Sequence, residues 1–203
     1  MSSRRLHAGL IVVALIVSSP ALAQFAKSGV VLPPSLGGPS PAPPSGPAPD
    51  LAFGAFQRGY YSTALREAMK RLAADPKDGP AMTLIGEIYR DGVSVKADPA
   101  EAARWYRQAA ATGFAPAQNQ LGWLYANGLG VTQDDTVAAD WFRRAADQGY
   151  APAQSNLGEL VYYGRGQKQD TEAAVAWFRA AAAGGLAHAR EWLVKLGRAT
   201  DGS

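Results

Sequence analysis

One spacing constrains the fold of this chain more than any other feature: tryptophans recur every 36 residues, at Trp105, Trp141 and Trp177. The residues around them repeat as well, because each tryptophan begins a segment of the form Trp-aromatic-Arg-x-Ala-Ala, and a glycine follows eight residues after it. A fixed period of this length is typical of stacked supersecondary units, none of which can bury its apolar face alone. The sequence therefore predicts a repeat protein.

Each unit is expected to contain two helices, since apolar residues recur at spacings of three and four throughout residues 50–198. In one unit, Asp98 is a suitable N-cap, Pro99 suits the first helical position, and Glu101 would complete a capping box. The same aspartate recurs in the next two units. A glycine just after the predicted end of this helix suits the left-handed conformation that stops a helix.

A glycine also recurs inside one helix of each pair, at Gly86, Gly122 and Gly158, where it costs ~1 kcal/mol relative to alanine. The simplest reason is close approach of the paired helix to a position without a β-carbon. The repeating tryptophans are in turn expected to be large apolar plugs between neighbouring units, so that truncating one should cost several kcal/mol.

These residues resemble the Sel1-like repeat family, a subclass of the tetratricopeptide-type helical repeats. The family pattern contains a Leu-Gly pair, a tyrosine after it and then a Gly-x-Gly-Val loop. Residues 102–134 match this pattern nearly throughout, and the next unit departs from it at Val161 and Gln167. The resemblance covers residues 51–197. It implies an all-α fold: a short right-handed α-solenoid of about four helix-turn-helix repeats plus a C-terminal capping helix around residues 187–196.

The two ends of the repeat region differ from its middle. The first unit lacks the repeating tryptophan and the Gly-x-Gly loop, and the spacing of Ala64 and Pro76 resembles an ordinary tetratricopeptide repeat. The last helix has no partner after it. Arg190, Glu191 and Lys195 would give that helix a polar outer face, as terminal caps of repeat stacks have.

Three segments are predicted to lie outside the repeat domain. Residues 1–23 have a positive start, an apolar run and a small-x-small sequence, which predicts a cleaved secretory signal, with an uncleaved anchor as the alternative. Residues 24–49 are proline-rich and predict a disordered linker, or else a ligand for a proline-recognising groove. Residues 199–203 are expected to be a disordered tail. The predicted location is therefore periplasmic or secreted, without an integral membrane segment after signal cleavage.

Composition argues against several classes of function. The chain has no cysteine, which excludes a disulfide framework and thiolate metal sites. The formal net charge of +3 falls to +1 without the two arginines of the predicted signal, which leaves no general field for nucleic acid. We expect no metal, no cofactor and no nucleic-acid partner.

Catalysis finds little support. Of the two histidines, only His188 lies outside the predicted signal, and we interpret it as a lone surface residue. Glu87 and Glu159 could suggest a glycosidase pair, but helices in a stack lie roughly 8–10 Å apart. Two repeats would then place these carboxylates well beyond the ~5–9.5 Å that such enzymes use. The prediction is a protein that is not an enzyme.

A ligand is expected on the concave surface of the stack, formed mainly by the first helix of each pair. Positions facing it should vary between units, because the packing positions are the ones that the period holds constant. The variable positions are polar with several aromatics, a composition that suits contact with peptides or sugars. The predicted ligand-binding residues are Thr83, Glu87, Arg90, Asn119, Trp123, Asn127, Ser155, Glu159, Tyr162 and Tyr163. Trp123 is the most informative, since it lies off the repeating register, although mere packing against neighbouring helices is an open alternative.

The sequence thus predicts an exported, non-enzymatic scaffold that binds a protein or peptide partner of the bacterial cell envelope. The resemblance implies roles such as an assembly factor for envelope complexes or a regulator of a membrane sensor. The alternative is a glycan- or peptidoglycan-binding module, motivated by aromatics interleaved with Asn, Glu and Arg. A hydrolase of unknown substrate is a third hypothesis.

Overall fold

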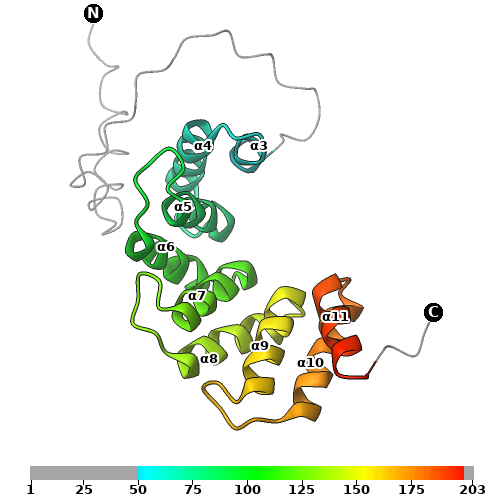
Figure 1. The fold of residues 1–203 in the computed structure, drawn as a ribbon. Coiled ribbons are helices and arrows are strands. Elements are labelled where there is room, and N and C mark those ends of the chain that lie inside the picture. Colours follow the sequence, from blue (N-terminus) through cyan, green and yellow to red (C-terminus); the bar gives the residue numbers. More distant parts are fainter. Residues whose placement is uncertain (1–49, 199–203) are drawn as a thin grey trace, which may run out of the picture. The chain divides into compact units, whose positions relative to one another are not determined.

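The computed structural model describes residues 50–198, which form helices and turns without a strand in that range (Figure 1). The helices are α3 (Leu51–Gln57), α4 (Tyr61–Ala74), α5 (Gly79–Asp91), α6 (Pro99–Ala111), α7 (Ala115–Asn127), α8 (Asp135–Ala146), α9 (Ala151–Tyr163), α10 (Thr171–Ala183) and α11 (Ala187–Lys195). Four pairs and a last single helix confirm the predicted all-α repeat solenoid with a capping helix. The predicted signal (1–23), linker (24–49) and tail (199–203) lie outside the described residues.

Successive helices of residues 50–198 pack on one another and form a curved row. In Figure 1, α5, α7, α9 and α11 line the inner side of this row, and α6, α8 and α10 lie on its outer side. The first helices of the pairs therefore form the inner surface. None of the helices described has both the length and the apolar character that crossing a membrane requires.

The periodic aspartates begin the second helix of each Sel1-like pair. Side-chain oxygens of Asp98, Asp134 and Asp170 accept hydrogen bonds from first-turn N–H groups of α6, α8 and α10. The reciprocal half of the predicted capping box is wrong, because the backbone N–H of Asp98 donates to the carbonyl of Tyr89 at 2.8 Å and is not free for Glu101. The equivalent bond recurs in the next two pairs, so each second helix is anchored at its start to the helix before it.

Each helix glycine lies against an aromatic ring of the paired helix. A β-carbon on Gly122 would lie 2.9 Å from the ring of Phe142, and one on Gly158 would lie 2.8 Å from that of Phe178. A β-carbon on Gly86 of α5 would lie 2.6 Å from the ring of Tyr106. Real β-carbons essentially never approach so closely, which confirms the predicted close approach of the paired helices.

The side chain that fills this space is the aromatic that follows each repeating tryptophan. These aromatics are at most 2% exposed, whereas Trp141 and Trp177 are only partly buried. The prediction of a tryptophan plug is therefore wrong for these two, and it holds for Trp105, which is 2% exposed. Consecutive side chains of a helix differ in direction by about 100°, so only one of two adjacent aromatics can point at the paired helix. The guanidinium of Arg144 covers Trp141 instead, 4.5 Å from the ring centroid.

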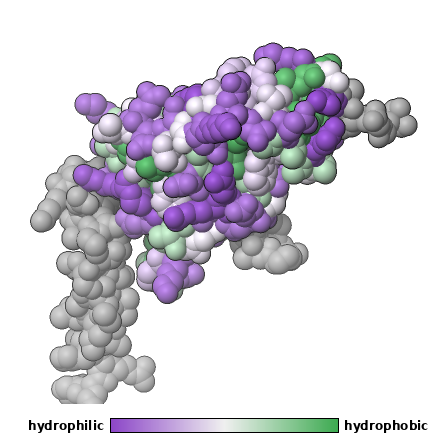
Figure 2. Space-filling model, turned by 90° about the horizontal axis from the view of Figure 1, so that it is seen from below, coloured by the Kyte–Doolittle hydropathy of each residue, from purple (hydrophilic) through white to green (hydrophobic). Residues whose placement is uncertain are grey.

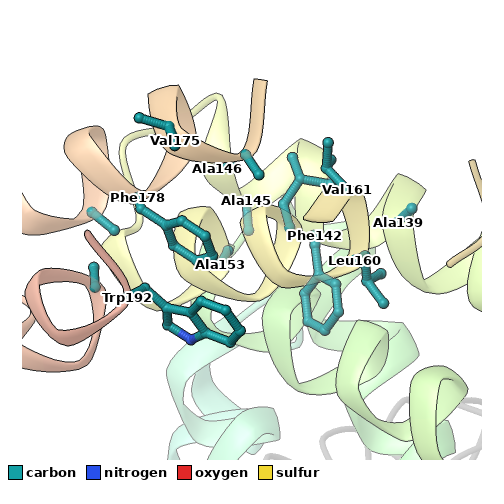
Figure 3. Close-up of a cluster of buried hydrophobic side chains, with 14 of the residues drawn as sticks. Ala139, Phe142, Ala145, Ala146, Ala153, Leu160, Val161, Val175, Phe178 and Trp192 are labelled. Carbon is teal, nitrogen blue, oxygen red and sulfur yellow. The ribbon is translucent and has the colours of Figure 1, made fainter. Parts of the chain in front are cut away.

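α11 closes the last pair. Its Trp192 stacks on Phe178 with the ring centroids 5.1 Å apart and the planes 4° from parallel, and Figure 3 shows the two rings side by side in the core. Arg190, Glu191 and Lys195 are exposed, as the prediction of a polar cap requires. In Figure 2, hydrophilic residues predominate on the face shown, and the largest hydrophobic area lies toward the end that carries α10 and α11.

Candidate functional site: the inner surface

The predicted ligand-binding residues occupy equivalent positions on α5, α7 and α9 and form rows that cross the inner side of the stack. The first row is buried: Thr83, Asn119 and Ser155 are 6%, 8% and 1% exposed. The hydroxyl of Thr83 donates to the carbonyl of Gly79, and the Ser155 hydroxyl has no hydrogen-bond partner among the described residues. These three residues lie between the helices rather than on the free surface.

The second row, Glu87, Trp123 and Glu159, reaches the surface. Trp123 is 38% exposed, and the two glutamates are partly buried. The exposure of Trp123 contrasts with the burial of Phe142, the aromatic that packs against the same helix. More than a third of the indole is therefore free to contact a ligand.

Glu87 is the most perturbed carboxyl of this row. Burial raises its pKa, while the charge of Arg90 and a hydrogen bond from the amide of Gln120 oppose the rise. Arg90 itself is held by Asp91, with Nε and Nη2 donating to the two carboxylate oxygens at 2.7 and 3.1 Å. The hydroxyl of Tyr106 is buried beside these charges, and no described residue is its hydrogen-bond partner. Arg90 thus neutralises its neighbouring aspartate first, and Glu87 only in part.

Polar side chains link the successive inner helices. The amide of Asn156 on α9 donates to Oδ1 of Asn119 on α7 at 2.8 Å. Nε2 of His188 on α11 lies 2.9 Å from a carboxylate oxygen of Glu159 on α9. The sequence analysis does not include Asn156 or its equivalent on α7, Gln120, among the site residues. A polar residue at the same position of two largely apolar helices could have indicated them.

Aromatic residues gather where α9 meets α11. The ring centroid of Tyr162 is 5.0 Å from that of Tyr163, and the two lie 5.3 and 5.9 Å from Trp192. Tyr163 is 55% exposed. The indole N–H of Trp192 donates to Nε2 of His188 at 3.2 Å, the same nitrogen that faces Glu159. One imidazole nitrogen cannot accept from an indole and donate to a carboxylate at once, so which ring nitrogen carries the proton decides which of the two bonds forms.

Two other predicted residues have local partners. Asn127 is exposed, and its amide donates to the carbonyl of Trp123 at 2.8 Å, one turn earlier in α7. Arg90, as described above, is paired with Asp91 on the same helix. Both side chains border the second row.

The surroundings of His188 do not form a catalytic triad. Its ring nitrogens face Glu159, Trp192 and Glu191, and no serine or threonine hydroxyl of residues 50–198 is hydrogen-bonded to it. Within residues 50–198 there is no group of three or more His, Asp or Glu side chains that could hold a metal ion. Two surface cavities of about 840 and 600 Å³ lie at turns of the stack, and none of the ten predicted residues lines them.

Comparison with known families identifies three consecutive Sel1 repeats, at residues 79–114, 115–150 and 151–186. They cover more than half of the 203 residues, so the chain belongs to the Sel1 repeat family. Repeats of this family are typically protein-interaction scaffolds. The pair α3–α4 precedes the first matched repeat, in agreement with its departure from the sequence pattern.

Solved structures show the same fold. A Sel1 repeat protein from Oxalobacter formigenes is 33% identical, with a TM-score of 0.63, over 68% of this chain and 56% of its own. A protective antigen present in uropathogenic Escherichia coli strains, which displays an SLR fold, is 34% identical, with a TM-score of 0.62, over 70% of this chain and 31% of its own. Cysteine rich protein B of Helicobacter pylori, at 21% identity and a TM-score of 0.50, over 63% of this chain and 92% of its own, shares the fold alone. A search of curated proteins finds no match.

The chain thus spans about half of the first structure and a third of the second. Activities and partners of those whole proteins do not transfer to it.

Proposed function

We propose that this protein is an exported, non-enzymatic scaffold that binds a protein or peptide partner of the bacterial cell envelope through its inner surface. The observation that carries the proposal is that the aromatic side chains of the repeats differ in burial. The aromatic that follows each repeating tryptophan is at most 2% exposed, while Trp123 and Tyr163, at variable positions, remain 38% and 55% exposed. Membership of a family of interaction scaffolds supports binding, and the sequence of residues 1–23 supports export.

Such a scaffold would act by holding its partner, as an assembly factor or a regulator. The inner helices suit this role because side-chain hydrogen bonds join α7 to α9 and α9 to α11, which restricts the relative movement of the exposed side chains on these helices. A pre-ordered surface loses little side-chain entropy when a ligand binds.

A glycan- or peptidoglycan-binding module is the second candidate. The favouring observation is that Trp123 is 38% exposed, lies one turn before the exposed Asn127 on α7, and is in one row with Glu159. Aromatic faces can stack on sugar rings, and amides and carboxylates can bond their hydroxyls.

The test is capture from envelope extract with the tagged full chain, the double variant Trp123→Ala/Glu159→Ala, and the control Arg179→Ala on the outer helix α10. We expect the wild type and the control to retain the same protein partners, identified by mass spectrometry, and the double variant to lose them at least tenfold. Unchanged protein capture together with reduced retention of glycan fragments would overturn the scaffold and favour the second candidate. Fractionation of the host, with the chain recovered from the periplasm or medium, tests export.

A further inference from the structure

The faces of the indoles are occupied differently along the chain. Arg144 lies over the ring of Trp141 at 4.5 Å, and Lys195 lies over that of Trp192 at 4.3 Å. In residues 50–198, no lysine or arginine covers Trp123, although its side chain is 38% exposed. Two indoles of residues 50–198 thus carry a cation, whereas Trp123 on the inner helix α7 carries none and is the most exposed of the tryptophans in that range.

Carboxylates occupy both neighbouring positions of the same row. Glu87 on α5 and Glu159 on α9 are equivalent to Trp123 on α7, so acid, indole and acid follow one another across the inner helices. Helices in direct contact lie about 8–10 Å apart, and the side-chain bond between Asn156 of α9 and Asn119 of α7 indicates a step of about this size along the row.

Neither carboxylate is committed to a lysine or arginine. The partner of Glu159 is the imidazole of His188, and Glu87 forms no ion pair within the described part of the chain. Arg90, the nearest guanidinium to Glu87 along the helix, is bound by Asp91. The row thus places a carboxyl group on either side of a partly exposed indole.

We propose that the partner segment is cationic: a lysine or arginine side chain of an extended peptide lies over Trp123, between the carboxylates of Glu87 and Glu159. This inference rests on the proposed scaffold function and names the chemistry of its ligand. The ring quadrupole and both carboxylates attract the same sign of charge, so their effects add. An extended chain rises about 3.3 Å per residue, so roughly three residues lead from one inner helix to the next.

The probe is a blocked nine-residue Gly-Ser peptide with arginine at its second, fifth and eighth positions. Two matched peptides carry glutamine or glutamate there. Each is titrated into the ¹⁵N-labelled full chain, and the indole N–H resonance of Trp123 is followed after its assignment with Trp123→Phe. We expect the arginine peptide to shift this resonance and to bind at least tenfold more tightly than the glutamine peptide. The glutamate peptide should cause no shift, and added salt should weaken the arginine peptide.

Isosteric variants test the two acids. Glu87→Gln/Glu159→Gln should lower the affinity for the arginine peptide at least fivefold, with an unchanged circular dichroism spectrum. The control Asp140→Asn/Glu172→Gln removes two exposed carboxylates from the outer helices α8 and α10 and should leave the affinity within twofold.

Three results would overturn the inference: equal binding of the glutamine peptide, full affinity of the double glutamine variant, or a Trp123 resonance that shifts only with an N-acetylglucosamine oligomer. If the arginine peptide fails while Trp123→Ala/Glu159→Ala still loses an envelope protein in the capture experiment, the scaffold function stands and only the cationic ligand is wrong. If both experiments fail, both proposals fail.

Discussion

The three Sel1 repeats and the preceding pair α3–α4 pack their helices in different ways. In each repeat, a glycine of the first helix lies under an aromatic ring of the second, as Gly122 does under Phe142. In the preceding pair, alanines such as Ala55 and Ala68 are buried instead, at 3% and 0% exposure, while Phe53 remains 49% exposed. A glycine opposite a ring therefore lets a large side chain enter the core without separating the helices.

The loops between the pairs show the same contrast. A β-carbon on Gly130, after α7, would lie 2.1 Å from the carbonyl oxygen of Pro99, so no side chain fits there. The equivalent position after α5 is Ser94, which keeps the left-handed conformation at φ 71°. Its hydroxyl lies 2.9 Å from that of Ser62 on α4. The loop that packs on the first pair thus has room for a side chain, and the loop that packs on a Sel1 repeat has none.

The largest expected effect distinguishes the two adjacent aromatics of a repeat. Phe178→Ala should lower the free energy of unfolding by about 3–5 kcal/mol, because the ring is 0% exposed and leaves a cavity. Trp177→Ala should cost less, roughly 1–2 kcal/mol, because this indole is only partly buried. Urea unfolding followed by circular dichroism measures both. If Trp177→Ala were as unstable as Phe178→Ala, Trp177 rather than Phe178 alone would fill the core between the helices.

The next effect compares glycines of the two regions. Gly122→Ala should destabilise the protein by about 1–3 kcal/mol in spite of the better helix propensity of alanine, because the new β-carbon overlaps the buried ring of Phe142. Gly54→Ala in α3 should instead stabilise by up to about 1 kcal/mol, since its nearest neighbour is the flexible end of Arg58 at 3.5 Å. Thermal unfolding of the two variants gives opposite signs. Shifts of the unfolding temperature with the same sign in both variants would contradict the inference that Gly122 lies against a ring while Gly54 has room for a β-carbon.

Much of this fold could be predicted from the period alone. The helices, the aspartate caps and the close approach at the glycines follow from residues that recur with the same neighbours. The choice between adjacent aromatics could not be predicted in this way, because Trp141 and Phe142 recur together and only the helix phase decides which one points inward. The capping box failed for a similar reason, since the N–H of Asp98 bonds a residue of the preceding helix.

The candidate site was predictable to the level of its helices. The period placed the variable positions on α5, α7 and α9, but variability alone did not reveal that Ser155 is 1% exposed while Tyr163 is 55% exposed. His188 was interpreted as a lone surface residue. Its bond to Glu159 arises because α11 returns beside α9, and a contact between a repeat and its cap has no counterpart in the repeating pattern.

The smallest expected effect concerns the ion pairs that tie the first pair to the repeats. Nε and Nη2 of Arg71 donate to the carboxylate of Asp78 at 2.7 and 2.9 Å, and Nη1 donates to Asp50. These aspartates are the N-caps of α5 and α3, so one guanidinium joins the starts of two helices. Arg71→Gln should lower the free energy of unfolding by about 1 kcal/mol near neutral pH, because these side chains are partly exposed.

The pH dependence of the free energy of unfolding tests whether the interaction of Arg71 with Asp50 causes this loss of stability. Burial raises the pKa of Asp50, but the hydrogen bond and charge of Arg71, with backbone N–H groups, outweigh it and lower the pKa below the ordinary 3.8. A carboxyl whose pKa is lowered by folding stabilises the protein above its unfolded pKa, and this contribution is lost as the pH falls through the folded pKa. The difference in the free energy of unfolding between wild type and Arg71→Gln should therefore narrow below pH 3.8.

Hydrogen exchange in the Arg71→Gln variant should become faster in α3 and α4 and stay unchanged in α9 to α11, because units of a repeat stack contact only their neighbours. Arg104→Gln, which breaks one pair with Glu101 inside α6, is the matched control and should cost at most about 0.5 kcal/mol. Equal losses in the two variants, or faster exchange along the whole stack, would show that Arg71 does not specifically join the first pair to the repeats.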